Sequence, residues 1–373
     1  MIKHGCSTRL KPFILYNKIL DKKIYIIYIY IIIIYNILYF KMSYGTICWN
    51  IKPQPVFIPN NFSISTAVDL MQLCVYTYKQ YDKYIANEEW TIPEPYKLKE
   101  TFYSFEKVDD NFYKKVPFGF ICSKQNENSR QDIYICLRGT RSAKEWEDDA
   151  KVPLVECSFL NDDTNDNTLK IKVHKGFQEV YINVNDVDKD LASIQEQIKN
   201  YLVKVDDYDN LWVTGHSLGA ALAIFAVIDI VTNTIHKDAI MYNFASPLVG
   251  NQAFANYFKS KIGTNKCDKN NNNLNTCSWR VVNTNDVVPT VPPPSKLFDY
   301  VHVNGCSGPG ICNNSGCSNL PVCNDNDVSK NGLFEITFAE KCTDLFNDIS
   351  CFVNAHNSDT YLSTLQNIKN NKQ

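Results

Sequence analysis

The sequence predicts an α/β fold in which a central, mostly parallel sheet is flanked by helices on both faces. Short runs predicted to be buried strands lie at residues 211–213, 239–244 and 278–282, of which the first is wholly apolar. Between the first two runs, residues 220–231 are small and apolar on nearly every side, as in a helix packed tightly against a sheet. Strands that alternate with helices favour parallel pairing. The 373 residues can bury a sizeable core, as one large domain or two smaller ones.

The N-terminal part of this fold is predicted to be a core-facing helix followed by two strands. Thr66 is placed to cap the helix, with Asp69 three residues later. The apolar stripe of the helix comprises Ala67, Leu70, Met71, Cys74, Val75 and Tyr78. Residues 116–123 and 132–137 are predicted to form two strands joined by a polar turn.

The remaining elements flank the strand at residues 211–213. A long helix is predicted to precede it and to end near Tyr201, because several apolar side chains fall close to one helical face. These are Phe177, Val180, Tyr181, Val184, Leu191, Ile194 and Ile198. Residues 298–303 are predicted to form the last strand of the sheet, and residues 359–368 the closing helix.

The strand at 211–213 leads into Gly215-His216-Ser217-Leu218-Gly219, which fits the pattern Gly-x-Ser-x-Gly. The pattern alone is weak evidence, but a strand before it and a helix after it make it a nucleophile elbow. The two glycines are needed because a Cβ at either position would crowd the sharp turn. Ser217 is therefore the predicted nucleophile.

An elbow of this kind needs an acid and a histidine that follow the serine in that order. Asp286 lies just past the predicted strand at 278–282, at the edge where α/β sheets place catalytic groups. Two histidines follow it. His356 precedes the last helix in a loop and is the predicted base, whereas His302 alternates with Tyr300 in a predicted strand and is interpreted as a packed, structural histidine.

An ester-cleaving serine also needs two donors for the oxyanion of its tetrahedral intermediate. The backbone N–H of Leu218, directly after the nucleophile, is the first predicted donor. The second must come from a loop after an earlier strand, and Thr140 follows the strand at 132–137.

At this point the chain resembles the class 3 (fungal-type) lipases and their plant relatives over roughly residues 62–365. The motifs that carry the resemblance are Arg138-Gly139-Thr140 with Glu145-Trp146; Val173-His174-Lys175-Gly176-Phe177; the Gly215–Gly219 elbow; Arg280-Val281-Val282-Asn283 with Asp286-Val287-Val288-Pro289; and His356-Asn357 with Tyr361-Leu362. The resemblance implies an α/β-hydrolase fold and hydrolysis of the acyl esters of glycerolipids. It also implies the roles of nucleophile, acid and base for Ser217, Asp286 and His356, with Thr140 and Leu218 in the oxyanion hole.

The resemblance further places a lid at residues 141–152, with Trp146 as its apolar anchor. This segment is rich in charge, since it contains Arg141, Lys144, Glu145, Glu147, Asp148 and Asp149. We therefore expect weak interfacial activation at a lipid–water interface. The insertion between His302 and His356 is Cys-rich and longer than the family core, which leaves the substrate class open.

The sequence leaves two alternatives to a lipid hydrolase. The first is a carboxylesterase for soluble esters such as feruloyl esters, which differs from a lipid hydrolase in its preference for acyl chain length. A catalytically silent relative that serves as a binding protein is the second alternative. The predicted mechanism requires no metal and no organic cofactor. With 38 Lys and Arg against 40 Asp and Glu, net charge provides no argument for a nucleic-acid partner.

Cysteine placement bears on the compartment of the protein. Six of the fourteen cysteines crowd the last fifth of the chain, and two more bracket an Asn-rich run. These are Cys306, Cys312, Cys317, Cys323, Cys342 and Cys351, with Cys267 and Cys277. We interpret them as disulfides formed in an oxidising compartment. Zinc is the alternative, although the spacing lacks the Cys-x2-Cys pair of common zinc sites. Cys74 and Cys136 are interpreted as core residues.

The N-terminus contains an apolar stretch at residues 24–40, which reaches the lower limit for a membrane span. Most flanking Lys and Arg residues precede it, so the remainder of the chain is predicted to be exported. The stretch is a membrane anchor, an over-long signal peptide, or translated non-coding sequence with the true start at Met42. The predicted organisation is an N-terminal segment (1–41), a linker (42–61) and an α/β-hydrolase domain (62–368). The predicted location is secreted or lumenal, or cytoplasmic if the chain starts at Met42.

Overall fold

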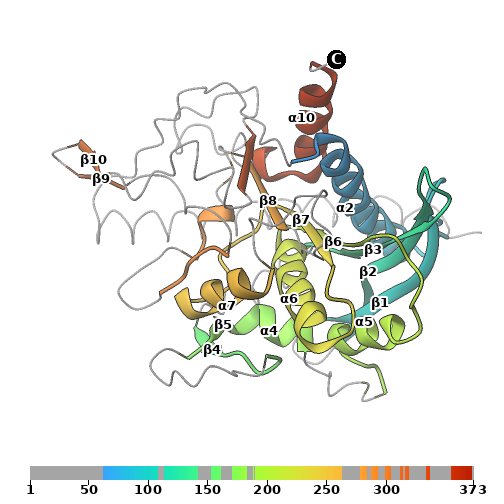
Figure 1. Cartoon of the computed structure of the whole chain (residues 1–373), viewed down its shortest axis with the longest axis horizontal. Coiled ribbons are helices and arrows are strands. Elements are labelled where there is room, and N and C mark those ends of the chain that lie inside the picture. The colour runs from blue at the N-terminus through green and yellow to red at the C-terminus, as the bar shows by residue number, and fades with distance from the viewer. Residues whose placement is uncertain are drawn as a thin grey trace, which may run out of the picture.

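The computed structural model describes a central seven-stranded sheet with helices on both faces (Figure 1). It describes residues 62–107, 113–141, 153–160, 170–182, 188, 190–262, 278–283, 286, 288–292, 299–303, 311–313, 316–318, 333–336 and 354–371. The strand order is β1-β2-β3-β6-β7-β8-β11. The strands are β1 (Lys97–Lys107), β2 (Tyr113–Gln125), β3 (Gln131–Leu137), β6 (Leu211–His216), β7 (Ile240–Phe244), β8 (Ser278–Asn283) and β11 (Leu333–Ile336).

The sheet is parallel from β3 through β6, β7 and β8 to β11, and antiparallel from β1 through β2 to β3. The predicted α/β-hydrolase class, with a mostly parallel sheet, is therefore confirmed. Two small antiparallel pairs lie outside the sheet, β4 (Leu154–Glu156) with β5 (Lys172–His174) and β9 (Ile311–Asn313) with β10 (Gly316–Ser318).

The helices divide between the two faces of the sheet. They are α2 (Ile64–Ile85), α4 (Lys175–Ile182), α5 (Ile194–Leu202), α6 (Leu218–Asn233), α7 (Gln252–Ile262) and α10 (Ser358–Asn370). Helices α4 to α7 share one apolar cluster with Ile133 and Ile135 of β3, whereas α2 and α10 share the other with Tyr134 and Cys136. Successive side chains of a strand point to opposite faces, so β3 contributes to both cores.

The predicted N-terminal helix is confirmed, but its cap is not Thr66. Ser63 caps α2 with its side chain, which accepts the backbone N–H of Thr66. Thr66 instead lies in the first turn and donates its hydroxyl to Ser63. The predicted apolar stripe is buried, and so are Cys74 and Cys136.

The predicted long helix before β6 is wrong, because the chain forms α4 and α5 as separate helices. Ser193 starts α5 with a capping box, in which its hydroxyl accepts from the backbone of Glu196 while the Glu196 carboxylate accepts from the backbone of Ser193. An N-cap residue has non-helical backbone angles, so a continuous helix cannot pass through Ser193.

Two predictions at the sheet edges also differ from the structure. Strand β1 was not predicted, because it is an edge strand whose described side chains are mostly polar or half-exposed. The described residues 299–303 contribute only an isolated bridge from Val301 to Gly250, and β11 pairs with β8 as the last strand. The described residues 299–303 lie beside the sheet rather than within it, and Tyr300 and Val303 are buried there.

Several predictions lie outside the described residues. These are the N-terminal segment 1–41 with its stretch 24–40, the linker up to residue 61, and the proposed lid with Trp146 beyond Arg141. The side chains of the clustered cysteines are also outside, so export and disulfides stay predictions. Within the described ranges, no helix is both long and apolar enough to cross a membrane. The same ranges contain no group of three or more His, Cys, Asp or Glu side chains arranged to hold a metal ion.

Candidate active site

Ser217 occupies a sharp turn between β6 and α6. Its backbone has φ 61° and ψ −128°, an unusual conformation for a residue with a side chain. The turn is held from both ends, since Ser217 N donates to Phe244 O (3.0 Å) and Ser217 O accepts from Ala220 N (2.9 Å). This backbone conformation directs the Ser217 side chain away from both β6 and α6, as the elbow motif predicts.

The two glycines of the elbow are required by close backbone contacts. A Cβ on Gly215 would lie 2.0 Å from the carbonyl oxygen of Gly219, and a Cβ on Gly219 would lie 2.2 Å from the carbonyl oxygen of Leu137. Both clashes are with backbone atoms, which no side-chain rotation relieves. The pattern Gly-x-Ser-x-Gly therefore follows from the packing of α6 against β3 and β6.

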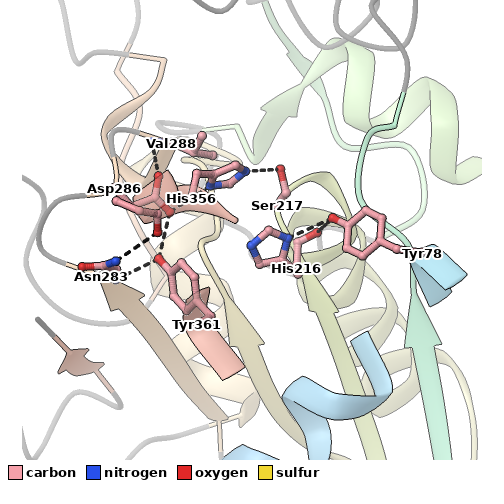
Figure 2. A network of polar contacts seen from close by, with 9 residues as sticks. Tyr78, His216, Ser217, Asn283, Asp286, Val288, His356 and Tyr361 are labelled. Carbon is pink, nitrogen blue, oxygen red and sulfur yellow. Dashed lines mark hydrogen bonds and ion pairs between the residues drawn. The ribbon is translucent and has the colours of Figure 1, made fainter. Parts of the chain in front are cut away.

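The structure brings Ser217, His356 and Asp286 into one hydrogen-bonded chain (Figure 2). His356 Nε2 lies 2.9 Å from Ser217 Oγ, and His356 Nδ1 lies 2.8 Å from Asp286 Oδ2. A carboxylate accepts hydrogen bonds only, so Nδ1 carries the proton and Nε2 is free to accept from the serine hydroxyl. The Asp286 side chain is fully buried and that of His356 is 12% exposed.

Asp286 is held by hydrogen bonds from its own loop and from α10. Its Oδ1 accepts from Val288 N (2.9 Å) and its Oδ2 accepts from the Tyr361 hydroxyl (2.8 Å). Tyr361 in turn accepts from Asn283 N (2.8 Å), at the end of β8. Burial, followed by the charge of Asp286, raises the pKa of Tyr361 well above its ordinary value, so this hydroxyl keeps its proton.

Asn283 links the same strand end to the segment that carries His356. Its side-chain nitrogen donates to Ala355 O (3.0 Å), one residue before the histidine. The roles of Asn283 and Tyr361 were not predicted, although both belong to the motifs quoted above. The only signal for Tyr361 was its position on the helix directly after His356.

The predicted oxyanion residues lie on neighbouring elements. Leu218 is the first residue of α6, so its N–H is at the N-terminus of that helix. Thr140 is buried in the loop after β3, the strand beside β6. A Cβ added to Gly139 would lie 3.1 Å from Ser217 Cβ, so this loop passes directly against the elbow. Arg138 holds the loop from inside, because its Nη1 donates to Gly139 O (2.8 Å) and its Nε to Pro117 O (3.0 Å).

Two further histidines near the site are structural. His302 is buried with Nε2 2.7 Å from Pro289 O, so the interpretation of it as a packed histidine is confirmed. His216 lies beneath the site, with its ring centroid 4.8 Å from that of His356 and its Nδ1 2.9 Å from the Tyr78 hydroxyl (Figure 2). Burial, then the neighbouring His356, lowers the pKa of His216 well below its ordinary value, and this imidazole stays neutral.

A Ser–His–Asp chain at the carboxyl ends of parallel strands, with the serine on an elbow before a helix, defines an α/β hydrolase. Residues 134–296 match the family model described as lipase (class 3). This part of the chain is therefore similar to the class 3 lipases.

Comparison with individual proteins gives more distant matches. The chain is 29% identical over 197 residues to the chloroplastic phospholipase A1-Igamma3 of Arabidopsis thaliana, covering 47% of this chain and 34% of that protein. It is 31% identical over 179 residues to a lipase of Rhizomucor miehei, covering 47% and 41%. A crystal structure of a lipase from Rhizopus microsporus var. chinensis matches with TM-score 0.45 and 25% identity over 70% of this chain and 80% of that one. The chain thus spans less than half the length of these two curated relatives.

Proposed function

We propose that this protein is a serine hydrolase that cleaves acyl esters of glycerolipids through an acyl-enzyme. The observation that carries the proposal is the chain of hydrogen bonds from Ser217 through His356 to Asp286. Such a chain activates a hydroxyl that is otherwise a weak nucleophile at neutral pH. The match of residues 134–296 to the class 3 lipase family model supports an ester as the bond that is cleaved.

In the proposed reaction, the Ser217 hydroxyl attacks the ester carbonyl while His356 Nε2 takes its proton. Asp286 keeps the proton of Nδ1 in place and stabilises the imidazolium that forms. The N–H groups of Leu218 and Thr140 receive the oxyanion of the tetrahedral intermediate. The imidazolium then protonates the departing alcohol, and a water molecule repeats the cycle on the acyl-enzyme. The reaction uses only side chains and backbone of this chain.

The substrate within this class is the finer part of the proposal. We favour acylglycerols as substrates. The acyl ester of a phospholipid is the alternative, because the relatives include a phospholipase A1 as well as a lipase. The two substrates share the ester that reacts and differ in the headgroup. They are therefore separated by assay rather than by the Ser–His–Asp geometry.

The test compares the full chain with Ser217→Ala on short- and long-chain triacylglycerols, phosphatidylcholine and a feruloyl ester. Ser260→Ala is the matched control, because its hydroxyl donates to Tyr257 O within α7, away from the site. We expect Ser217→Ala to lose roughly 10⁶-fold in kcat, as in other Ser–His–Asp enzymes, and Ser260→Ala to retain activity.

Each outcome of this test has a distinct meaning. Faster turnover of acylglycerols than of phosphatidylcholine supports the finer proposal, and the reverse order replaces it with phospholipase activity. Selective turnover of the feruloyl ester indicates an esterase for soluble substrates. If the folded wild-type chain turns over no ester and is not labelled by a fluorophosphonate, the protein is a silent relative with a binding role.

A further inference from the structure

The loop that contains Thr140 is bonded to helix α2 through the residue that follows Thr140. Arg141, the next residue, donates from Nε to Asp82 Oδ1 (3.2 Å) and from Nη2 to Asp82 Oδ2. This is a two-point contact between a planar guanidinium and a carboxylate, which sets orientation as well as distance. The guanidinium also lies over the ring of Tyr78, 5.1 Å from its centroid.

Tyr78 reaches the same loop from inside. It lies one helical turn before Asp82, so both side chains project from the same face of α2. The Tyr78 hydroxyl bonds His216 Nδ1 (2.9 Å), and Figure 2 shows it approaching His216 from the side opposite to Tyr361. A Cβ added to Gly139 would lie 2.0 Å from this hydroxyl, so Tyr78 lies directly against Gly139. The ring of Tyr78 thus separates the elbow from Arg141.

We propose that Asp82, Arg141 and Tyr78 form a clamp that positions the backbone of Thr140 as an oxyanion donor. The inference rests on the proposed function, because it assigns residues that support the oxyanion hole of that reaction. All three are positioning residues, since they act through Gly139 and Thr140 rather than by contact with the substrate. The clamp involves none of the hydrogen bonds that join Ser217, His356 and Asp286.

The clamp acts on the transition state more than on the bound ester. The oxyanion needs its donors at hydrogen-bond distance only when negative charge develops on the carbonyl oxygen. A loop that moves by a fraction of an ångström still admits the substrate but stabilises the oxyanion less well. Loss of the clamp should therefore lower kcat and leave KM nearly unchanged.

The ionic part of the clamp is also sensitive to salt. The Arg141 side chain is 42% exposed and that of Asp82 is 52% exposed, so solvent ions screen their attraction. For a small soluble ester, kcat of the wild type should fall as the salt concentration rises from 0.05 to 1 M, with the screening length shrinking to about 3 Å. An enzyme without the carboxylate should show a flatter response.

The experiment measures kcat and KM for p-nitrophenyl butyrate with the full-length wild type, Asp82→Asn and Arg141→Ala. Rates are divided by the concentration of serine that an organophosphate titrates, so partial misfolding does not count as lost catalysis. We expect kcat to fall roughly tenfold, well short of the roughly 100- to 1,000-fold loss that follows removal of a whole oxyanion donor. KM should stay within about twofold, as for an interaction made only in the transition state.

A boronic acid provides the second readout, because its adduct with serine places a negatively charged oxygen in the oxyanion hole. Its inhibition constant should weaken by the same factor as kcat, as for other mimics of the transition state. The double variant Asp82→Asn/Arg141→Ala should be no worse than the single variants. Glu88→Gln is the matched control, because Glu88 pairs with Lys83 near the same end of α2 and its side chain is 55% exposed, against 52% for Asp82.

The outcomes separate this inference from the proposed function. If Ser217→Ala hydrolyses the ester as fast as the wild type, the proposed function fails. If Ser217→Ala is inactive while Asp82→Asn and Arg141→Ala keep wild-type kcat and boronate affinity, the clamp is refuted alone. If Glu88→Gln and Asp82→Asn lower kcat equally, the clamp is also refuted, because the loss then reflects the change in net charge. If one single variant does not fold, the charge-swapped pair Asp82→Arg/Arg141→Asp is compared with the single variant that does fold, and a kcat no higher than that of this variant overturns the clamp.

Discussion

Tyr361 connects the candidate acid to the strand that carries it. Its hydroxyl donates to Asp286 Oδ2, the oxygen that also accepts from His356, while it accepts from the backbone of Asn283. A carboxylate with a fixed orientation holds the imidazole in the tautomer that the proposed reaction needs. The acid is thus positioned by hydrogen bonds from α10 as well as by its own loop.

Tyr361→Phe should lower kcat roughly tenfold or less, because the carboxylate loses one donor but keeps His356 and Val288 N. Steady-state kinetics with a soluble ester measures the change. Tyr242→Phe is the control, since Tyr242 is also buried in the α2 and α10 cluster and its hydroxyl accepts from Ser63 N. Equal losses in both variants would contradict a specific role for Tyr361.

At the scale of elements, Asp229 of α6 joins three helices under the sheet. The carboxylate is 1% exposed and accepts from Tyr181 of α4 (3.0 Å) and from Gln195 of α5 (2.8 Å). Lys199 of α5 lies 3.0 Å away as its counter-charge. These hydrogen bonds and the ion pair replace the hydrogen bonds to water that the carboxylate loses on burial. This network fixes the helix that begins at the elbow against its neighbours.

Asp229→Ala should lower the free energy of unfolding by about 3 kcal/mol, because it leaves the partners of a buried charge without an acceptor. Urea unfolding provides the measurement. Asp207→Ala is the comparison, since the Asp207 side chain is 92% exposed and its ion pair with Arg130 lies in solvent, so this change should cost about 0.5 kcal/mol or less. A difference below about 1 kcal/mol between the variants would refute the network as a major stabilising contact.

Gly219 allows α6 to pack closely against β3, because its backbone lies against the end of that strand. Gly219→Ala would place a methyl group 2.2 Å from Leu137 O, and only separation of α6 from β3 relieves that contact. We expect a destabilisation of about 3 kcal/mol or more, seen as a fall in the thermal midpoint. Ala226→Gly in the same helix should cost about 2 kcal/mol, through lower helix propensity and the loss of one buried methyl group. Similar midpoints for the two variants would exclude the predicted clash.

At the scale of the whole molecule, three buried histidines are neutral in the folded state. Burial lowers the pKa of His174 to about 3, and lowers those of His216 and His302 well below their ordinary value. The same side chains have a pKa of about 6.5 in an unfolded chain. Below that pH the unfolded state binds protons that the folded state does not. The stabilising contribution is therefore complete above about pH 6.5 and is lost as the pH falls, for His174 until about pH 3.

The free energy of unfolding should accordingly fall between pH 7 and pH 5, by about 2 kcal/mol for His174 alone. His216 and His302 act in the same direction. Urea unfolding of the wild type at pH 7, 6 and 5 measures the slope, and His174→Gln should reduce it, because its amide oxygen replaces the acceptor for Phe177 N without a titratable group. Identical slopes for the two proteins would contradict the assignment of His174.

The sequence alone determined the parts of this protein that depend on local pattern and on order along the chain. The Gly-x-Ser-x-Gly turn, the parallel strands around it, and the order Ser217, Asp286, His356 are all visible without coordinates. The placement of Asp286 was predictable because the carboxyl ends of parallel strands meet at one edge of the sheet. His356 was predicted from its order in the chain after the serine and the acid. The cap at Ser193 was also local, but the apolar spacing of a single long helix outweighed it.

Only the tertiary structure decided which side chains support these residues. Tyr78 and His216 are 138 positions apart, Tyr361 and Asp286 are 75 apart, and Arg141 and Asp82 are 59 apart. None of these pairs has a spacing that one helix or strand would impose. Their contacts arise because α2 and α10 pack on the same face of the sheet, and that packing follows from the distribution of apolar surface over the whole chain. Tertiary packing also decided that β11, and not the predicted strand at 298–303, is the last strand, because pairing with β8 depends on which segment reaches that edge of the sheet.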